Sequence, residues 1–358
     1  MIEGIGNDCV GVAGRTFADN HTQSSGPPFR RLRSRNVIHR ILPKRVRHLS
    51  PLRPSAILTR FAEEVKADRI LCNFGTEAVT YSEAWSKLDM PLFVHFHGFD
   101  LTFDLRDPNG SGALVHDPGY KASIVELSKR AIFIANSNYS KNCLCEIGVP
   151  ESRIRINYLG VEPASYQDVR KQARPNLLSV GRLIDCKGPD QTIRAFNRVR
   201  EMGTDATLTL IGDGPMMGIC QSLVASSAYA SDIRLLGSQP YSEVQRNLNE
   251  ANVFTMHSMR GIVTHQEEAF GVAFLDAMNA GLPVVTGRSG GITEIVKHGE
   301  NGYLFEPGDL EQHAQYLCDL IEHEENAHKM GRSAWETVQA NFTQAQANER
   351  LRHILGTV

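Results

Sequence analysis

Residues 268–285 of this chain have the sequence Glu268-Ala-Phe-Gly-Val-Ala-Phe-Leu-Asp-Ala-Met-Asn-Ala-Gly-Leu-Pro-Val-Val285. An acid and a glycine precede a run of good helix formers, which predicts a helix over Gly271–Ala280. Gly281 is placed to end this helix, and Pro283 begins a short apolar run that is typical of a buried strand. A helix followed closely by a buried strand is the repeating unit of an α/β protein.

The same alternation of short apolar runs and helix-period segments extends along most of the chain. Because the connections are only a few residues long, it predicts right-handed βαβ units and parallel sheets. The predicted strands are Ile70–Phe74, Leu92–Phe96, Ala131–Ala135, Ile154–Tyr158, Leu177–Val180, Thr207–Ile211, Ile233–Leu235, Val253–Met256 and Val284–Thr286. The other predicted helices are Ala56–Lys66, Glu77–Leu88, Tyr120–Lys129, Ser140–Ile147, Pro189–Met202, Met216–Ser227, Ser242–Asn249 and a helical tail from Leu310 onward.

The length of 358 residues favours two domains, and the polar stretch 162–176, which contains Pro163 and Pro175, is the predicted linker. We expect two Rossmann-like domains that face each other across a deep cleft. The first is expected over residues 1–165, of which 1–54 are basic and poorly defined, the second over 172–340, and a last helix over 341–358. Ligands of such parallel sheets bind at the carboxyl ends of the strands.

The composition excludes several classes of protein. With 41% hydrophobic and 22% charged residues the chain is neither disordered nor collagen-like, and no apolar run approaches the ~18–20 residues that span a bilayer. The first residues lack the features of a signal peptide, and the seven scattered cysteines include no C-x-x-C pair. We therefore expect a cytoplasmic protein whose cysteines are reduced and mostly buried.

The net charge of −2 hides an asymmetry between the two halves of the chain. Residues 1–165 carry a charge of +4 and the remainder −6, and eight cations lie within Arg30–Arg47. A solvated loop is the simplest interpretation of this basic run, and peripheral contact with an anionic membrane is the alternative. Nucleic-acid binding is not expected, because Phe29 is the only aromatic residue near the run.

The loop before the helix predicted over 271–280 is the strongest candidate binding site. The unpaired N–H groups at the helix start, around Phe270, Gly271 and Val272, can bind an anion or a hydroxyl group. Glu268 precedes the helix and Asp276 lies about two turns further along, so the two acids can hold different parts of one ligand. The alternative is that Glu268 only stabilises the helix dipole and that Asp276 is solvated.

A second candidate site follows the first strand of the second domain, in Ser179-Val-Gly-Arg-Leu-Ile-Asp-Cys-Lys-Gly188. Arg182 and Lys187 lie five residues apart across a turn, so both can converge on one anion such as a diphosphate. The alternative is a pair of unrelated surface cations. In Leu210-Ile-Gly-Asp-Gly-Pro215, Gly212 and Gly214 allow either the close approach of a ligand or simply a tight turn.

The first domain contributes weaker candidates. His97, in Val94-His-Phe-His-Gly-Phe-Asp100, follows a predicted strand and is a candidate polar contact in the cleft, with His95 on the same face as its support. Near the N-terminus, residues 10–13 are a candidate first strand, after which Gly14 would open a turn. A lone histidine or glycine in such a place more often serves the structure than a ligand.

Together these segments resemble the retaining glycosyltransferases of the GT-B fold, in the large nucleotide-sugar family 4, and in particular those of bacterial exopolysaccharide and lipopolysaccharide synthesis. Residues 268–284 are similar to the family phrase E-G-F-G-x-x-x-x-E-A-M-A-x-G-x-P-V, with Ala269 and Asp276 as departures. Shorter similarities are to its phrases G-R-x-x-x-x-K-G at 181–188, I-G-x-G-P at 211–215, G-G-x-x-E at 290–294 and H-G-x-D at 97–100.

The resemblance implies a role for each candidate residue. Arg182 and Lys187 would bind the diphosphate of a nucleotide sugar, Glu268 the hydroxyl groups of the sugar and Asp276 the ribose, while His97 would contact the sugar from the first domain. The G-G-x-x-E segment is implied to face the donor as well. The remaining implied donor contacts are Gly14, Gly181, Gly212, Leu236, Gly237, Phe270, Gly271 and Val272.

The function implied by the resemblance is transfer of a hexose-type sugar from a nucleoside diphosphate sugar to a glycan or lipid-linked acceptor, with retention. The implied GT-B fold has C-terminal helices that pack back toward the first domain. Neither a cofactor nor a metal is expected, because Arg182 and Lys187 already supply positive charge and the D-x-D pair of other nucleotide-sugar enzymes is absent. The alternatives are a nucleotide-sugar epimerase of the same fold and a non-catalytic nucleotide-sugar-binding protein. The donor base, the sugar and the acceptor stay open.

Overall fold

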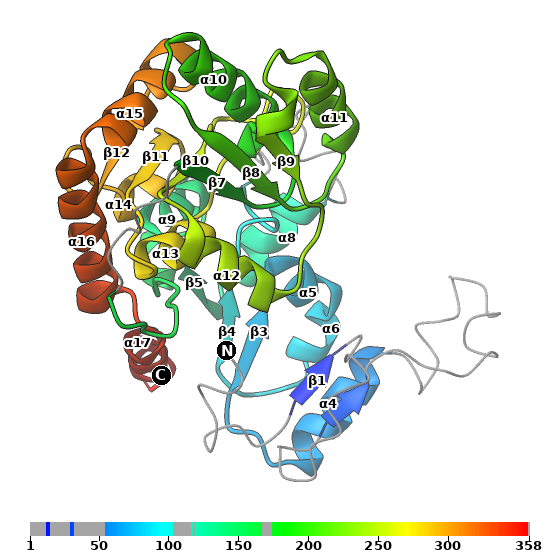
Figure 1. Cartoon of the computed structure of the whole chain (residues 1–358). Coiled ribbons are helices and arrows are strands. Elements are labelled where there is room, and N and C mark those ends of the chain that lie inside the picture. Colours follow the sequence, from blue (N-terminus) through cyan, green and yellow to red (C-terminus); the bar gives the residue numbers. More distant parts are fainter. Residues whose placement is uncertain are drawn as a thin grey trace.

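The computed structural model describes residues 12–14, 29–31, 54–102, 116, 119–166 and 174–356 (Figure 1). Two parallel sheets form the centres of two α/β units, which confirms the predicted fold class. The first sheet has the order β3 (Ile70–Asn73), β4 (Leu92–His95), β5 (Ala131–Ala135), β6 (Ile154–Ile156). The second has the order β12 (Gly302–Phe305), β11 (Val284–Gly287), β10 (Val253–Met256), β7 (Asn176–Val180), β8 (Thr207–Ile211), β9 (Ile233–Leu235).

Helices cover both faces of the first sheet, which is why its central strands are apolar at consecutive positions. On one face, Phe93 and Ile134 pack against Leu351 and Ile354 of α17 (Gln344–Leu355), the last helix of the described chain. Successive residues of a strand point to opposite faces, so their neighbours Val94 and Phe133 belong to the core on the other face. That core is closed by α4 (Pro54–Glu64), α5 (Gly75–Thr80), α6 (Ser82–Trp85), α8 (Tyr120–Leu127) and α9 (Asn138–Glu146).

The second sheet is also covered on both faces. One core contains Phe254 and Val284 and packs against α13 (Val272–Asn279) and α16 (Glu324–Asn341). The other contains Val253 and Val285 and packs against α10 (Pro189–Glu201) and α15 (Leu310–Glu322). The other helices of this unit are α11 (Met217–Ser226), α12 (Tyr241–Glu250) and α14 (Ile292–Ile295).

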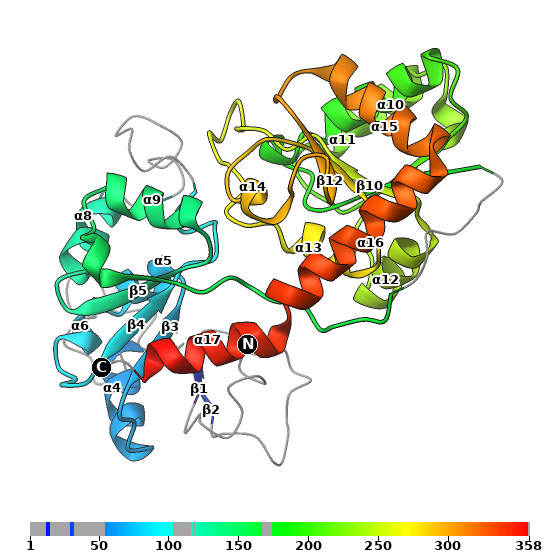
Figure 2. The same cartoon turned by 90° about the vertical axis from the view of Figure 1, so that its left-hand side faces the viewer.

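The chain crosses between the two units once before β7 and once between α16 and α17, and the two crossings lie side by side (Figure 2). The Val161 N–H bonds to the Phe342 C=O at 3.0 Å, and the Gln344 N–H bonds to the Val161 C=O at 2.8 Å. Arg69 Nη1 donates to the Leu355 C=O at 2.5 Å and so holds the end of α17 on the first unit. The last helix, α17, therefore packs back on the first unit, as the resemblance implied.

Some elements of the main units differ from the expectation. Glu77–Leu88 forms two helices, α5 and α6, because the chain turns at Tyr81 and lets the buried Trp85 indole donate to the Ala78 C=O at 2.6 Å. Strand β12 has no predicted counterpart, because four residues that begin with a glycine give too short a signal.

The N-terminal segment also departs from the expectation. Gly14 ends β1 (Val12–Gly14), which pairs with β2 (Phe29–Arg31) in a separate two-stranded sheet and therefore does not join the four-stranded sheet. The turn predicted after Gly14, and the basic run except for Arg30 and Arg31, lie outside the described residues.

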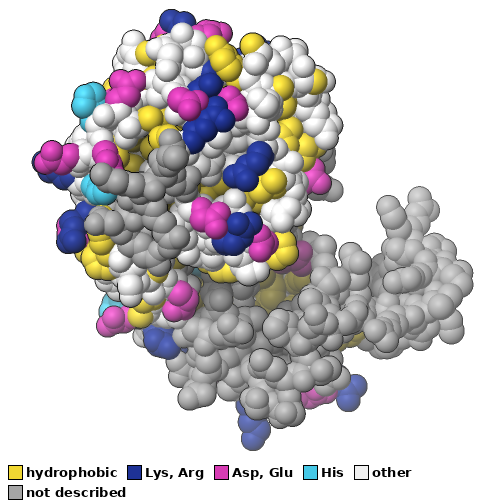
Figure 3. Space-filling model, in the orientation of Figure 1, with side chains coloured by type: hydrophobic (Ala, Val, Ile, Leu, Met, Phe, Trp, Pro, Cys, Tyr) yellow, Lys and Arg dark blue, Asp and Glu magenta, His cyan; other side chains and the backbone are white. Residues whose placement is uncertain are grey.

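The state of the cysteines and the distribution of surface charges can be compared with what the composition predicts. The six described cysteines are free, and five of them are buried. On the face of the second unit seen in Figure 3, Lys and Arg side chains lie among Asp and Glu side chains, so charges of both signs are interspersed there. None of the helices in the described ranges is long and apolar enough to cross a bilayer.

Two buried histidines of the second unit are held neutral by a directed chain of hydrogen bonds. The Gly308 N–H donates to His257 Nε2 at 2.9 Å, so His257 carries its proton on Nδ1 and donates it to Nδ1 of His313 at 3.0 Å. His313 then donates from Nε2 to Thr255 Oγ1 at 2.7 Å, and Thr255 donates to the Val285 C=O at 3.1 Å. Protonation of either ring would break this chain.

Acidification from pH 7.5 to pH 5.5 is expected to lower the free energy of unfolding. Burial lowers the pKa of His257 to about 4, against the opposing charges of Asp190 and Asp309, and holds the pKa of His313 well below 6.5. Both rings titrate near pH 6.5 when unfolded, so unfolding takes up protons over this range. His257 alone then lowers the free energy of unfolding by about 1 kcal/mol, and His313 acts in the same direction. Thermal unfolding at both pH values measures the effect, and an unchanged midpoint would contradict it.

Candidate functional site

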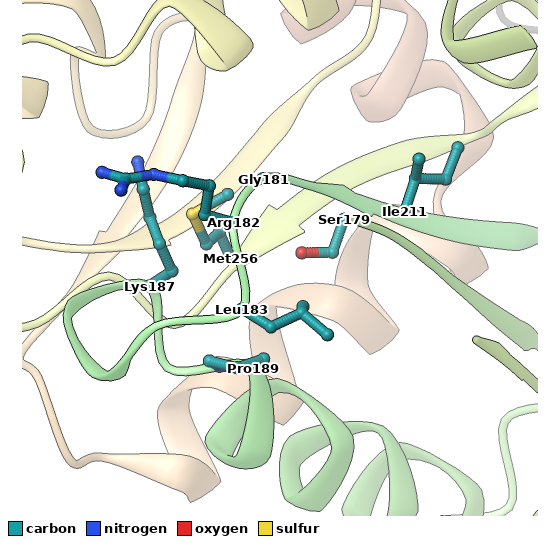
Figure 4. A pocket seen from close by; sticks show the side chains of 8 residues that line it. All are labelled: Ser179, Gly181, Arg182, Leu183, Lys187, Pro189, Ile211 and Met256. Carbon is teal, nitrogen blue, oxygen red and sulfur yellow. The ribbon is translucent and has the colours of Figure 1, made fainter. Parts of the chain in front are cut away.

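The predicted diphosphate loop, residues 181–188, connects β7 to α10 at the carboxyl end of the six-stranded sheet. It contains a 3₁₀ turn, Asp185–Lys187, and ends at Gly188. Gly188 has a φ of +53°, and a Cβ there would lie 2.2 Å from the His257 C=O, so the loop can close only on glycine. In Figure 4 the charged ends of Arg182 and Lys187 lie on the same side of this loop, where one anion can meet both.

A small pocket opens beside these two cations (Figure 4). A Cβ on Gly181 would come within 3.2 Å of Met256 Cε, so a larger residue would crowd the pocket. No group of three or more His, Cys, Asp or Glu side chains in the described part of the chain is placed to hold a metal ion. The pocket is lined by Ser179, Gly181, Arg182, Leu183, Lys187, Pro189, Ile211 and Met256.

Lys187 joins the two strongest sequence motifs, because its ammonium group forms an ion pair with the Glu268 carboxylate. The exposed fractions of the two side chains are only 17% and 14%. Burial, with a smaller contribution from Arg182, lowers the pKa of Lys187 to about 8. A cation that is partly stripped of water interacts strongly with an incoming anion.

Glu268 lies in the loop that leads into α13, and its backbone is held by the loop after β11. The Gly291 N–H bonds to the Glu268 C=O at 2.8 Å, and a Cβ on Gly290 would lie 2.0 Å from the same oxygen. Gly271, with a φ of +104°, is the N-cap of α13, and a Cβ there would lie 3.5 Å from Glu268 Cγ. The carboxylate therefore lies next to the first turn of α13.

Asp276 lies about one turn along α13. It faces Tyr241 of α12, whose hydroxyl donates to Asp276 Oδ1 at 3.4 Å. Burial raises the pKa of Asp276 to about 6, and the Tyr241 hydrogen bond opposes this shift. At the helix start, Val272 is exposed, whereas the Phe270 ring is buried against Tyr158. Tyr241, which no sequence motif indicates, is thus a neighbour of the predicted ribose contact.

The predicted backbone contacts at Gly212, Leu236 and Gly237 lie at the ends of β8 and β9. Their polar groups bond largely within the protein, since the Gly212 N–H donates to the Gly237 C=O at 2.8 Å and the Gln239 amide donates to the Leu236 C=O at 2.6 Å. Gly237 has a φ of +65°, and no atom lies within 4 Å of a Cβ placed on it. A ligand can therefore approach the backbone at Gly237. Gly212 instead packs against the neighbouring loops.

Substitution of Gly212 by alanine is expected to lower the free energy of unfolding by ~3 kcal/mol. Its φ of +141° disfavours any side chain, and a Cβ would lie 1.8 Å from the Gly181 C=O, which is backbone and cannot move aside. The matched control is Gly218→Ala in α11, where the added methyl has no atom within 4 Å and should stabilise by about 0.5–1 kcal/mol. Chemical denaturation measures both, and equal effects would contradict this account.

His97 follows β4 and is fixed as a neutral ring. Its Nε2 lies 2.9 Å from Asn73 Oδ1, which only accepts, so the proton is on Nε2. Burial lowers the pKa of His97 to about 4. The ring centroids of His95 and Phe74 lie 4.4 and 4.7 Å from that of His97, so His95 is on the same face, as predicted. Asn73, at the end of β3, is a partner that no motif indicates.

Asp100, the last residue of the H-G-x-D phrase, holds the loop that carries His97. Its carboxylate accepts from the N–H groups of Gly75, His97 and Gly98 at 2.8, 3.0 and 3.0 Å. Burial raises the pKa of Asp100, and these three hydrogen bonds oppose the shift. The loops after β3 and β4 are therefore tied to one carboxylate.

The two units meet at the loop that contains Glu268. A Cβ on Gly98 would lie 3.1 Å from the Ala269 Cβ, and the Ser137 hydroxyl donates to the Ala269 C=O at 2.6 Å. His97 and Glu268 are each one residue away from this contact. The structure therefore brings the predicted histidine of the first unit and the predicted acid of the second onto facing loops.

Glu294, the last residue of the G-G-x-x-E phrase, directs its carboxylate to the first unit. It accepts from the N–H groups of Asn138 and Tyr139 at 2.9 Å each, at the start of α9. The Asn138 amide and the Tyr158 hydroxyl donate to the same carboxylate at 2.8 and 2.9 Å. The unpaired N–H groups at a helix start attract a carboxylate, so this residue joins the two units.

Two sequence families match adjoining parts of the chain: Glycosyltransferase Family 4 over residues 16–165 and Glycosyl transferases group 1 over residues 164–337. The amylovoran biosynthesis glycosyltransferase AmsK of Erwinia amylovora is 30% identical over 59% of this chain and 53% of its own length, so the match spans about half of that relative. The putative colanic acid biosynthesis glycosyltransferase WcaL of Salmonella typhimurium is 27% identical over 85% of this chain and 74% of its own length.

Solved structures share the arrangement of both units. HepE of Anabaena, in complex with UDP and glucose, has a TM-score of 0.72 at 21% identity and covers 87% of this chain and 83% of HepE. A glycosyltransferase of Rickettsia africae has a TM-score of 0.72 at 17% identity and covers 93% of this chain and 86% of its own. At these identities the likeness shows a common fold.

Proposed function

The chain belongs to the glycosyltransferases of the GT-B fold, and from that premise we propose that it transfers a hexose-type sugar from a nucleoside diphosphate sugar to a glycan or lipid-linked acceptor, with retention of configuration. The contact between Lys187 and Glu268 carries the proposal. It places a cation suited to a diphosphate against a carboxylate suited to sugar hydroxyl groups. In a nucleotide sugar the diphosphate is bonded directly to the sugar, so the groups that bind these two parts must also lie side by side.

In the proposed reaction, Arg182 and Lys187 bind the diphosphate and stabilise the negative charge that builds on it as the glycosidic C–O bond breaks. Glu268 orients the sugar, Asp276 holds the ribose, and His97 contacts the sugar from the first unit. The acceptor oxygen attacks the anomeric carbon from the face that the diphosphate leaves, and its proton passes to a phosphate oxygen. This displacement retains configuration without a protein nucleophile.

UDP-glucose is the first donor to test, because HepE, whose fold is similar, has been solved in complex with UDP-glucose. WcaL and AmsK are named for the biosynthesis of colanic acid and amylovoran, so the proposed acceptor is an intermediate of polysaccharide synthesis. We place the reaction in the cytoplasm, at the inner face of the membrane.

The basic run Arg30–Arg47 is the proposed contact with that membrane. Each cation near an anionic lipid surface contributes about 1 kcal/mol. Co-sedimentation with anionic liposomes should therefore fall when the cations of the run are replaced by glutamine. If the variant and the parent bound the liposomes equally well, the run would be only a solvated loop.

The transfer proposal is tested with purified protein, a panel of UDP-, GDP- and ADP-sugars, and oligosaccharide acceptors. Thermal shift identifies the donor, and NMR of the product identifies the anomeric configuration, which is expected to match that of the donor. Epimerised donor without transfer would support an epimerase, and binding without turnover would support a non-catalytic protein. If no nucleotide sugar is bound or turned over, the proposal fails.

Chelation of divalent cations with EDTA is expected to leave the transfer rate unchanged. The reason is that Arg182 and Lys187 already bring positive charge to the diphosphate, which is the charge that a metal ion would otherwise supply. Initial rates with and without EDTA measure the effect. A loss of rate that Mg²⁺ or Mn²⁺ restores would show that a metal takes part.

A further inference from the structure

Asp185, which no sequence motif singles out, connects the diphosphate loop to the loop that leads to Glu268. Its Oδ1 accepts from the Cys186 N–H at 2.9 Å and from the Thr264 hydroxyl at 2.7 Å. Its Oδ2 accepts from the N–H groups of Val263 and Thr264 at 2.9 and 2.8 Å. Because three of the partners are N–H groups divided between the two oxygens, a carboxylate satisfies them and an amide does not.

The surroundings of Asp185 keep the two loops together. A Cβ on Gly261 would lie 2.6 Å from Asp185 Oδ2, so only a glycine lets the second loop approach the carboxylate. The Met259 N–H bonds to the Cys186 C=O at 3.0 Å and makes a second link between the loops. Burial acts to raise the pKa of Asp185, but the hydrogen bonds from Thr264 and its neighbours outweigh burial and hold the pKa below its usual value.

Each loop carries one member of the Lys187–Glu268 ion pair at the proposed donor site. Lys187 follows Asp185 by two residues, and Glu268 follows Thr264 by four. Between Thr264 and Glu268, the Gln266 amide donates to the Thr102 hydroxyl of the first unit at 3.2 Å. A shift of either loop would therefore move one member of the Lys187–Glu268 pair relative to the other.

We propose that Asp185 is a positioning residue of the donor site, which holds Lys187 at the diphosphate and Glu268 at the sugar in one fixed relation. The inference rests on the proposed function. The hydrogen bonds of Asp185 go to the two loops, and it acts through them. A misplacement of about 1 Å in a catalytic group can cost about 100-fold in rate, so loss of this carboxylate should lower kcat/KM by about 10- to 100-fold.

A double-mutant cycle tests the proposal. It compares the parent, Asp185→Ala, Lys187→Ala and the double variant by kcat/KM for sugar transfer and by calorimetric Kd for UDP and GDP. Asp185→Ala should lower kcat/KM and weaken nucleotide binding in the parent, but have a smaller effect in the Lys187→Ala background, where only Glu268 is left for it to position. Asp185→Asn can keep both hydrogen bonds to Oδ2, so its effect should be smaller than that of Asp185→Ala.

Asp309→Ala is the matched control. Asp309 also bonds a backbone N–H, that of Gln312 at 2.9 Å, but it does so at the start of α15. This variant should lower the thermal midpoint and keep the parental kcat/KM. Equal losses from Asp185→Ala in both backgrounds, or parental kcat/KM in Asp185→Ala, would overturn the inference while leaving the proposed function intact. A parent that neither binds UDP or GDP nor transfers sugar would overturn both.

Discussion

Replacement of Lys187 by alanine is expected to lower kcat/KM for sugar transfer by about two to three orders of magnitude. The substitution removes one of the two cations that meet the leaving diphosphate, and it leaves the Glu268 carboxylate without its ion-pair partner. Loss of one preorganised group at a developing negative charge raises the barrier by about 3–4 kcal/mol. Steady-state kinetics at saturating acceptor measure the effect.

The control for this prediction is Lys329→Ala, because Lys329 is an exposed residue of α16 and its loss should not change kcat/KM.

The pH dependence of donor binding by the parent is a second check on the role of Lys187. The pKa of Lys187 is about 8 in the free protein, and a bound diphosphate would raise it, so binding takes up a proton above pH 8. Donor affinity should be constant below pH 8 and fall by up to about tenfold per pH unit above it. Parental kcat/KM in Lys187→Ala, or a flat affinity up to pH 10, would contradict the assignment.

Replacement of Glu268 by glutamine is expected to lower kcat/KM by about 100-fold and to leave UDP binding at least as tight as in the parent. The amide keeps the size of the side chain, but it is a weaker acceptor for sugar hydroxyl groups. In the absence of donor the carboxylate competes with a diphosphate for Lys187, so removal of its charge releases the lysine for UDP. Kinetics and calorimetry on the same preparation measure both effects.

The matched control is Glu300→Gln, since Glu300 is exposed in the turn before β12 and should affect neither quantity. Opposite effects on turnover and on UDP binding separate an acid that acts on the sugar from one that only supports the fold. If Glu268→Gln instead weakened UDP binding and lowered the thermal midpoint together, Glu268 would be a structural residue.

The strands of both sheets were predictable because helices cover them on both faces. The bounds of Ala131–Ala135, Thr207–Ile211 and Val253–Met256 follow directly from apolar runs between turn residues. The break in the helix expected over 77–88 was not predictable, because it depends on the Trp85 indole reaching the Ala78 carbonyl in the folded chain. The order of the strands in each sheet likewise depends on pairing between distant segments.

The charged residues of the candidate site could be named from the sequence, and most of the residues that support them could not. Arg182, Lys187 and Glu268 follow the ends of parallel strands, and such ends meet at one edge of a sheet. Three supporting contacts join residues far apart in the sequence. Asn73 lies 24 positions from His97, Asp185 lies 79 from Thr264, and Ser137 lies 132 from Ala269.

By itself the sequence determined the α/β class, the resemblance to the family and the charged residues of the proposed donor site, because apolar periodicity, glycine positions and charged residues are local properties of the chain. Only the tertiary structure decided that Lys187 pairs with Glu268, that His97 is neutral and that Glu294 holds α9. Burial and the pairing of charges arise when distant segments pack together, and it is this packing that sets their protonation states and partners.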